Sequence, residues 1–205
     1  MASPILEGER LTMRFGGLVA MAEVSFELAR GEILGIIGPN GSGKSTLFNI
    51  ISGLYVPSSG EVRLEGQRLN GVPAHTIVKR GVARTFQSSR LFDDLSVLDN
   101  VIIGRHTHTH CGVFDAIFRR GRANGELKRA AAHSERLLRT VSRNLFEQRH
   151  RPAAELPQAD RRRLEIARAL ASEPKVLMLD EPSSACRLMS SIDPSLQEGR
   201  DPAAL

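Results

Sequence analysis

Residues 38–45 read GPNGSGKS, a glycine-rich stretch that ends in a lysine and a serine. The stretch fits the phosphate-binding pattern G-x-x-x-x-G-K-[ST] in full. Glycines let the backbone wrap around phosphates with its N–H groups pointing inward, and the N-terminus of a following helix adds a favourable partial charge. The residues that we expect to bind a nucleotide here are Gly38, Pro39, Asn40, Gly41, Ser42, Gly43, Lys44, Ser45 and Thr46.

Two acidic residues follow the apolar run VLML, residues 176–179, near the other end of the chain. Open α/β sheets bind their ligands beyond the carboxyl ends of such strands. We therefore expect Asp180 to hold Mg²⁺ through water and Glu181 to act as general base on an attacking water. Lys44 would reach the β- and γ-phosphates, and the Ser45 hydroxyl would bind Mg²⁺. The acidic pair is a weak signal alone, but with the loop it indicates a nucleotide hydrolase.

Both motifs need strands and helices to position them. Residues 32–37, bounded by glycines, are a candidate buried strand before the loop, and LFNIISG after it predicts a helix closed by Gly53. Residues 175–180 are apolar on both faces, which predicts a central parallel strand. Alternating runs between these segments predict further strands, with a hairpin that turns at Glu65 and Gly66.

The character of the sequence changes between about residues 91 and 156. LSVLDNVIIG and ELKRAAAHSERLLRTV have helical spacing, and no run of the strand type lies between them. We expect a helical insertion here. A further helix, RRRLEIARALAS, should follow, with Asp160 as its cap and its end before Pro174.

The composition sets wide limits on function. A chain of 205 residues is long enough for one substantial domain with an inserted lobe. The formal charge of +5 includes local runs such as residues 161–163, so it is weak evidence for binding to nucleic acid or anionic lipid. No apolar run is long enough to span a bilayer, and the N-terminus lacks the pattern of a secretory signal. Any role at a membrane is therefore expected to be peripheral and to depend on a partner.

Three further stretches point to one family. ARTFQ contains Gln87, RRRLEIARALASEPKVLMLDEP joins a basic helix to the acidic strand, and MRFGGLVA places Phe15 upstream of the loop. Together they resemble the ATP-binding subunit of ABC transporters, and RFGGLVA, GVARTFQ and RLFDDLSVLDNVIIG are most similar to the branched-chain amino-acid importers. The resemblance covers about residues 5–185. It implies an α/β fold of the P-loop NTPase (ABC ATPase) type, with an antiparallel β subdomain, a helical subdomain inserted at about 91–156 and a truncated C-terminal part.

The resemblance also implies roles for individual residues. In the family an aromatic residue at the position of Phe15 stacks on adenine. A glutamine at the position of Gln87 contacts Mg²⁺ and the attacking water, and couples the site to the membrane subunit. The catalytic residues would then be Glu181 and Gln87, and the Mg²⁺ ligands Ser45, Gln87 and Asp180. A packed core aromatic is the alternative for Phe15, and a solvated loop residue the alternative for Gln87.

The implied function is ATP hydrolysis that powers an importer of branched-chain amino acids. In the family two ATP molecules are sandwiched between two ATPase subunits, and closure and opening of that dimer drive transport. We therefore expect ATP and Mg²⁺ as ligands, and a polytopic membrane permease and a second ATPase subunit as partners. The expected location is peripheral, at the cytoplasmic face of the cell membrane, and no nucleic acid partner is expected.

Two segments depart from the family pattern. The family has a Leu-Ser-Gly-Gly-Gln-like segment whose serine and glycines bind the γ-phosphate held by the partner subunit. This chain has LPQAD at residues 156–160, with no hydroxyl, no glycine and an added negative charge. Residues 186–205 contain no histidine and no apolar strand, so we expect the ABC-type domain at 1–185 and a tail of coil or short helix at 186–205. Hydrolysis should therefore be slow relative to binding.

Three other interpretations stay open. HTHTHC at residues 106–111 would suit zinc or nickel if it were extended, because alternate residues of a strand share one face, although a polar loop is equally natural. The first alternative function is a soluble ABC-type ATPase acting on nucleic acid or ribosomes, but the chain has no second phosphate loop. The second is a P-loop kinase, whose chemistry needs neither Gln87 nor the RRRLEIARAL helix.

Overall fold

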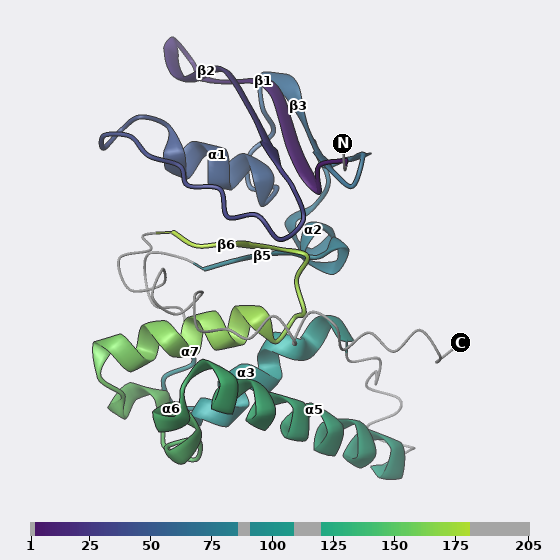
Figure 1. Ribbon diagram of the computed structural model, residues 1–205, viewed down its shortest axis with the longest axis vertical. Helices are drawn as coiled ribbons and strands as arrows, with labels where there is room; N and C mark the ends of the chain where they lie inside the picture. The colour runs from purple at the N-terminus through teal and green to yellow at the C-terminus, as the bar shows by residue number, and fades with distance from the viewer. Residues whose placement is uncertain (1–2, 86–90, 109–119, 181–205) are drawn as a thin grey trace. The chain divides into compact units, whose positions relative to one another are not determined.

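The computed structural model describes residues 3–85, 91–108 and 120–180 (Figure 1). The chain forms two compact units. Among the described residues, the first unit contains residues 3–84 and Pro174–Met178, and the second contains residues 85–173 together with Leu179 and Asp180. No helix among the described residues is both long and apolar enough to cross a membrane.

An antiparallel sheet with the strand order β2-β1-β3-β4 forms one layer of the first unit. Its strands are β1 (Leu6–Phe15), β2 (Leu18–Leu28), β3 (Ser59–Leu64) and β4 (Gln67–Arg68). Gly60 in β3 has a φ of +86°, and a Cβ there would lie 2.4 Å from the carbonyl oxygens of Glu9 and Arg10. The close approach of β3 to β1 therefore requires a glycine. The expected antiparallel β subdomain is confirmed.

The hairpin between β3 and β4 has a two-residue loop, because Leu64 pairs with Gln67. The loop residues, Glu65 and Gly66, both have positive φ, 48° and 74°. Positive φ at both central positions is typical of a type I′ turn, whose twist matches that of the flanking strands. The turn predicted at Glu65 and Gly66 is confirmed.

The carboxylate of Glu65 connects this turn to two other segments of the first unit. It forms ion pairs with Arg30 and with Lys175, whose Nζ lies 2.5 Å from Oε2. The hydrogen bond from Lys175 is the main cause that holds the pKa of Glu65 below its ordinary value, and Arg30 lowers the pKa further. The hairpin is thereby fixed to the segment before the phosphate loop and to the residue that precedes β6.

We expect Glu65→Gln to lower the free energy of unfolding by about 0.5 kcal/mol near neutral pH, because partly exposed ion pairs contribute little. The pKa of Glu65 is lower in the folded than in the unfolded protein. Its contribution is therefore complete above the unfolded pKa and is lost as the pH falls through the folded value. Urea unfolding at about pH 7 and about pH 3 measures this. Glu27→Gln, an exposed carboxylate on β2, is the control, and a difference that grows at acid pH would contradict the expectation.

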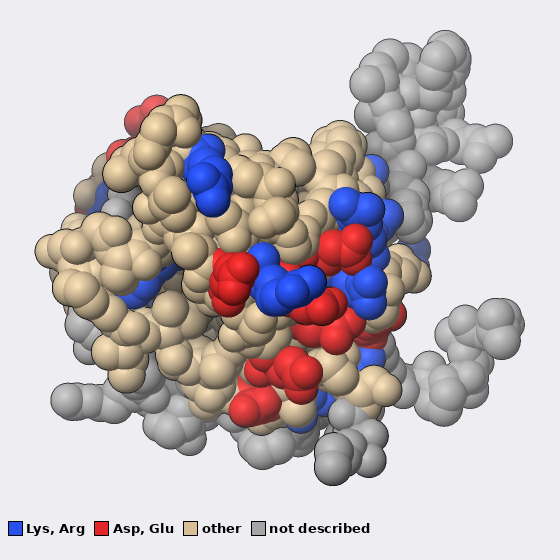
Figure 2. Space-filling model, turned by 90° about the horizontal axis from the view of Figure 1, so that it is seen from above, with Lys and Arg blue, Asp and Glu red and all other residues tan. Residues whose placement is uncertain are grey.

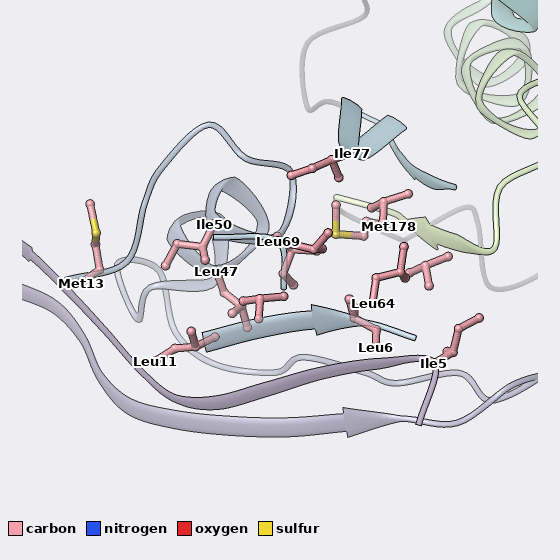
Figure 3. Close-up of a cluster of buried hydrophobic side chains, with 14 of the residues drawn as sticks. Ile5, Leu6, Leu11, Met13, Leu47, Ile50, Leu64, Leu69, Ile77 and Met178 are labelled. Atoms are coloured by element: carbon pink, nitrogen blue, oxygen red, sulfur yellow. The ribbon is translucent and has the colours of Figure 1, made fainter. Parts of the chain in front are cut away.

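Helix α1 (Lys44–Ile51) begins at the end of the phosphate loop and packs on the sheet. Its apolar residues Leu47, Ile50 and Ile51 are buried. Figure 3 shows side chains of α1 among those of β1 and β3, with Leu69 and Met178. The helix ends as predicted, because Gly53 follows with a φ of +73° and donates its N–H to the carbonyl of Ile50.

A second, parallel sheet of the first unit contains β5 (Val82–Arg84) and β6 (Val176–Met178). Helix α2 (Ala74–Arg80) leads into β5 and ends at Gly81, whose φ is +105°. Val176 and Met178 are buried, as expected for the apolar strand. The strand is shorter than predicted, and β5 is its one neighbour among the described residues. The parallel pairing is confirmed, and the central position stays a prediction.

The buried strand predicted at residues 32–37 is also wrong. The segment forms no strand, and its side chains are exposed, Ile33 by 74% and Ile37 by 98%. Its apolar composition suits a strand covered on both faces. Such burial needs sheet neighbours, and none of the described strands pairs with this segment.

The second unit is helical. It contains α3 (Val97–Gly104), the 3₁₀ turn η1 (Arg105–His108), α5 (Arg120–Val141), α6 (Arg143–Glu147), the 3₁₀ turn η2 (Ala153–Glu155) and α7 (Gln158–Leu170). Its core includes the fully buried Val97, Val101, Leu138, Leu145 and Leu164. The described residues between 91 and 156 contain helices and no strand, as the helical spacing predicts.

Asp160 does not cap the last helix, contrary to expectation. Helix α7 begins at Gln158, with Pro157 as its N-cap residue, so Asp160 lies within the first turn. Its side chain is buried, accepts a hydrogen bond of 2.9 Å from Asn144 Nδ2 and forms an ion pair of 2.8 Å with Arg163. A proline suits the start of a helix because its φ is already near the helical value. In this sequence Pro157, and not Asp160, marks the start of helix α7.

Candidate nucleotide-binding site

The phosphate loop is held against β2 by its last glycine. Gly43 has a φ of +90°, and a Cβ there would lie 2.7 Å from the carbonyl oxygen of Ala20. Gly41 also has a positive φ, of 82°. Only glycine combines such backbone angles with so close an approach. The backbone conformation of the loop therefore explains why the motif has glycines at positions 41 and 43.

The ammonium of Lys44 lies over the loop. Its Nζ donates hydrogen bonds of 2.7 Å to the carbonyl oxygens of both Gly38 and Pro39. Lys44 is also the first residue of α1, and no side chain caps this helix. The uncapped N–H groups of the first turn and the ammonium together favour an anion at this place. Phosphate oxygens are stronger acceptors than carbonyls for an ammonium, because they carry charge.

The two hydroxyl residues after Lys44 lie in the first turn of α1. Ser45 is exposed and Thr46 is half-buried. The Ser45 hydroxyl is therefore accessible to a ligand at the start of the helix. Hydroxyl and carboxylate oxygens are ligands that suit Mg²⁺.

Asp180 lies two residues beyond the end of β6. It is half-buried, and its backbone N–H donates a hydrogen bond of 3.4 Å to the Thr85 hydroxyl. Thr85 itself follows directly after β5. The carboxylate thus stands at the carboxyl end of a parallel strand, as the sequence predicts. Asp180 belongs to the second unit and the loop to the first, so their proximity stays a prediction.

The two residues expected to be catalytic, Glu181 and Gln87, lie outside the described residues. Their roles stay predictions. The tail 186–205 also lies outside.

The histidine-rich candidate metal site lies partly outside as well. His106 is described, in the 3₁₀ turn η1, and its Nδ1 lies 3.2 Å from the carbonyl oxygen of Ile103. A strand with histidines on one face is therefore wrong for the start of this segment. Among the side chains that the structure describes, no group of three His, Cys, Asp or Glu residues is placed to hold a metal ion.

Phe15 is the last residue of β1, and 43% of its surface is exposed. Such exposure excludes a fully packed core position, which was the alternative interpretation. Its ring contacts the ring of Tyr55, with centroids 5.4 Å apart and an angle of 75° between the planes. Sequence reasoning missed Tyr55. The available signal was its rarity, because it is the one tyrosine in the chain.

A hollow of about 350 Å³ lies on the antiparallel sheet, away from the phosphate loop. Its lining combines Glu7, Glu9, Glu27 and Glu61 with Arg63, and includes no residue of the loop. The hydrogen bond with Glu61 holds the pKa of Arg63 above its ordinary value. On the face in Figure 2, the described basic and acidic side chains lie side by side and form no extended basic patch of the kind that binds nucleic acid.

The segment that departs from the family pattern, LPQAD, includes the start of α7. The carboxylate of Asp160 lies inside the helical unit, where Arg163 forms an ion pair with it and Asn144 donates a hydrogen bond to it. The expected electrostatic obstacle to a docking anion is therefore smaller than the sequence suggests. The missing hydroxyl and glycines remain as the departure.

Comparison with known proteins gives a family and close relatives. The model of the ABC transporter family matches residues 21–184. The chain is 39% identical over 184 residues to the high-affinity branched-chain amino acid transport ATP-binding protein BraF of Pseudomonas aeruginosa. It is 42% identical over 189 residues to the corresponding protein LivG of Escherichia coli. Each match covers 90% of this chain and 71% of the relative.

Solved structures of ATP-binding cassettes from ABC transporters have the same fold as this chain. A nucleotide-free ATP-binding cassette from an ABC transporter superposes with a TM-score of 0.74 at 29% identity, covering 95% of this chain and 76% of that one. The ADP conformation of the cassette MJ1267 gives a TM-score of 0.72 at 27% identity, covering 96% and 74%. The fold is therefore that of the P-loop ABC ATPases, and the chain belongs to the ABC transporter family of ATPases.

Proposed function

We propose that the chain is the ATP-binding and ATP-hydrolysing subunit of an importer of branched-chain amino acids. The observation that carries the proposal is the phosphate loop, held by Gly43 against β2 with the Lys44 ammonium over it. The similarity to BraF and LivG over 90% of the chain supports the class of substrate.

The proposed chemistry is transfer of the γ-phosphoryl group of ATP to water, which gives ADP and phosphate. The first-turn N–H groups of α1 and the ammonium of Lys44 bind the phosphates and neutralise their charge. Glu181 accepts the proton that the attacking water loses, and Gln87 orients that water. In this proposal Gln87 aligns the attacking water and Glu181 activates it.

The chemistry of the predicted donors suits a magnesium ion. Ser45 supplies an accessible hydroxyl and Asp180 a half-buried carboxylate, and both are oxygen donors of the kind that Mg²⁺ prefers. Gln87 would complete the set with its amide oxygen. Bound Mg²⁺ would neutralise charge on the β- and γ-phosphates during hydrolysis.

We further propose that the chain works at the cytoplasmic face of the membrane with a polytopic permease and a second ATPase subunit. The relatives BraF and LivG are transport proteins by name, and the comparisons give no support to action on nucleic acid.

Co-purification tests the partner. A tagged chain expressed with the permease of its own transport system should be recovered from detergent-solubilised membranes together with that permease. An unrelated polytopic membrane protein at equal expression is the control. Recovery of the chain from the soluble fraction alone, bound to RNA or ribosomes and without permease, would instead support the soluble ATPase.

A further inference from the structure

Phe15 and Tyr55 form an aromatic pair on the surface of the first unit. Their ring centroids are 5.4 Å apart and the planes meet at 75°, which is an edge-to-face contact. The exposed fractions are 43% for Phe15 and 38% for Tyr55. Both rings therefore remain exposed enough for a third planar group, such as an aromatic base, to stack on them.

Tyr55 is fixed to the helix that carries the phosphate loop. Its backbone N–H donates a hydrogen bond of 3.1 Å to the carbonyl of Asn49, and the N–H of Leu54 donates one of 2.8 Å to the same carbonyl. Asn49 lies in α1, which begins at Lys44. The position of the tyrosine ring therefore follows the position of this helix.

Phe15 is connected to the same loop by a second path. It pairs with Leu18 at the turn between β1 and β2. Ala20 follows Leu18 by two residues in β2. A Cβ on Gly43 of the phosphate loop would lie 2.7 Å from the carbonyl oxygen of Ala20, so β2 and the loop are in close contact. The chain after Tyr55 is bound to β1 as well, because the N–H of Arg14 donates to the Ser58 hydroxyl at 3.0 Å. Backbone hydrogen bonds and the close approach of Gly43 to β2 thus connect the aromatic pair to the phosphate loop.

We infer that Tyr55 is a positioning residue for nucleotide base binding, which holds the Phe15 ring so that one of its faces stays open to adenine. This rests on the proposed function, ATP binding, and on the role in stacking on adenine that the family resemblance implies for Phe15. In an edge-to-face pair Tyr55 covers at most one face of Phe15, so the other face is available. A ring already held in its binding orientation loses less conformational freedom when the base stacks on it. The contact needs the aromatic ring of residue 55 and not its hydroxyl.

The experiment compares two ligands on purified full-length variants by calorimetry. MgATP carries base and phosphates, whereas inorganic tripolyphosphate with Mg²⁺ carries only the phosphates. We expect Tyr55→Leu to weaken ATP binding about threefold to tenfold, the size of one aromatic contact, and to leave tripolyphosphate binding unchanged. Tyr55→Phe should retain the wild-type affinity for both ligands. In a Phe15→Leu background, Tyr55→Leu should have no further effect on ATP, because both changes remove the same interaction.

Three results would overturn the inference. Equal weakening of ATP and tripolyphosphate by Tyr55→Leu would mean that the tyrosine only supports the loop. Weakening of ATP by Phe15→Leu but not by Tyr55→Leu would leave the base site in place without Tyr55. Unchanged selectivity between the two ligands in both single variants would remove the base site itself, while tripolyphosphate binding still reports on Lys44.

Discussion

Replacing Glu181 by glutamine is expected to lower the rate of ATP turnover by about 10²-fold or more and to leave the affinity for ATP unchanged. Glutamine has nearly the size of glutamate but cannot accept the proton that water loses on attack. The phosphates are bound elsewhere, by the loop and by Lys44, so binding should not depend on the carboxylate. Among the expected effects in this protein, this one is the largest.

Steady-state phosphate release and ATP calorimetry on the same preparation separate the two quantities. Glu147→Gln is a matched control, because Glu147 is an exposed glutamate of α6 that has no role in the proposed chemistry. Turnover that is unchanged in Glu181→Gln but abolished by Gln87→Ala would assign the activation of water to the other predicted residue. Turnover unchanged in both variants would refute the catalytic assignment.

The wild-type rate is itself informative. We expect it to lie well below the order of 10 s⁻¹ that is common for enzymes. LPQAD lacks the hydroxyl and glycines that would meet the partner's γ-phosphate, and residues 186–205 contain no histidine. The structure excludes one possible cause of slow turnover, the negative charge of Asp160. Asp160 is bound by Asn144 and Arg163, so its charge is compensated inside the helical unit. A slow rate would therefore point to the missing donors or the missing histidine, and not to repulsion by Asp160.

Local patterns predicted those parts of the fold that short-range chemistry determines. The phosphate loop, its helix and the end at Gly53 follow from glycine angles and helical spacing over a few residues. The turn at Glu65 and Gly66 follows from the demand for positive φ in a two-residue hairpin. These features need no information from distant residues, which is why the sequence alone was sufficient.

Features that depend on distant partners were harder to predict. Residues 32–37 have the composition of a buried strand, but burial is decided by whether another strand pairs with them. Asp160 has the residue type of a cap, yet Asn144 and Arg163 provide stronger partners inside the helical unit. The contact of Tyr55 with Phe15 joins positions far apart in the chain and has no spacing signature. Each of these outcomes depends on tertiary contacts.

The second large effect is expected from Lys44→Ala. We expect MgATP affinity to fall at least tenfold, about 1.4 kcal/mol, which is the scale of one charge-assisted contact. In the structure the Lys44 ammonium lies within 2.7 Å of the carbonyls of Gly38 and Pro39, where it can bind phosphate oxygens and also hold the loop. Alanine removes both interactions.

Calorimetry with MgATP measures the loss, and thermal unfolding without nucleotide shows whether the fold survives the substitution. Lys79→Ala is the matched control, because Lys79 is an exposed lysine in the last turn of α2 and its loss changes the net charge by the same amount. A general electrostatic effect of losing one positive charge would weaken ATP binding in both variants, and more so at low salt. A contact at the phosphates would weaken it in Lys44→Ala alone and persist as the salt concentration rises. Equal MgATP affinity in wild type and Lys44→Ala would rule out the loop as the nucleotide site, because no other side chain within residues 38–46 carries a positive charge.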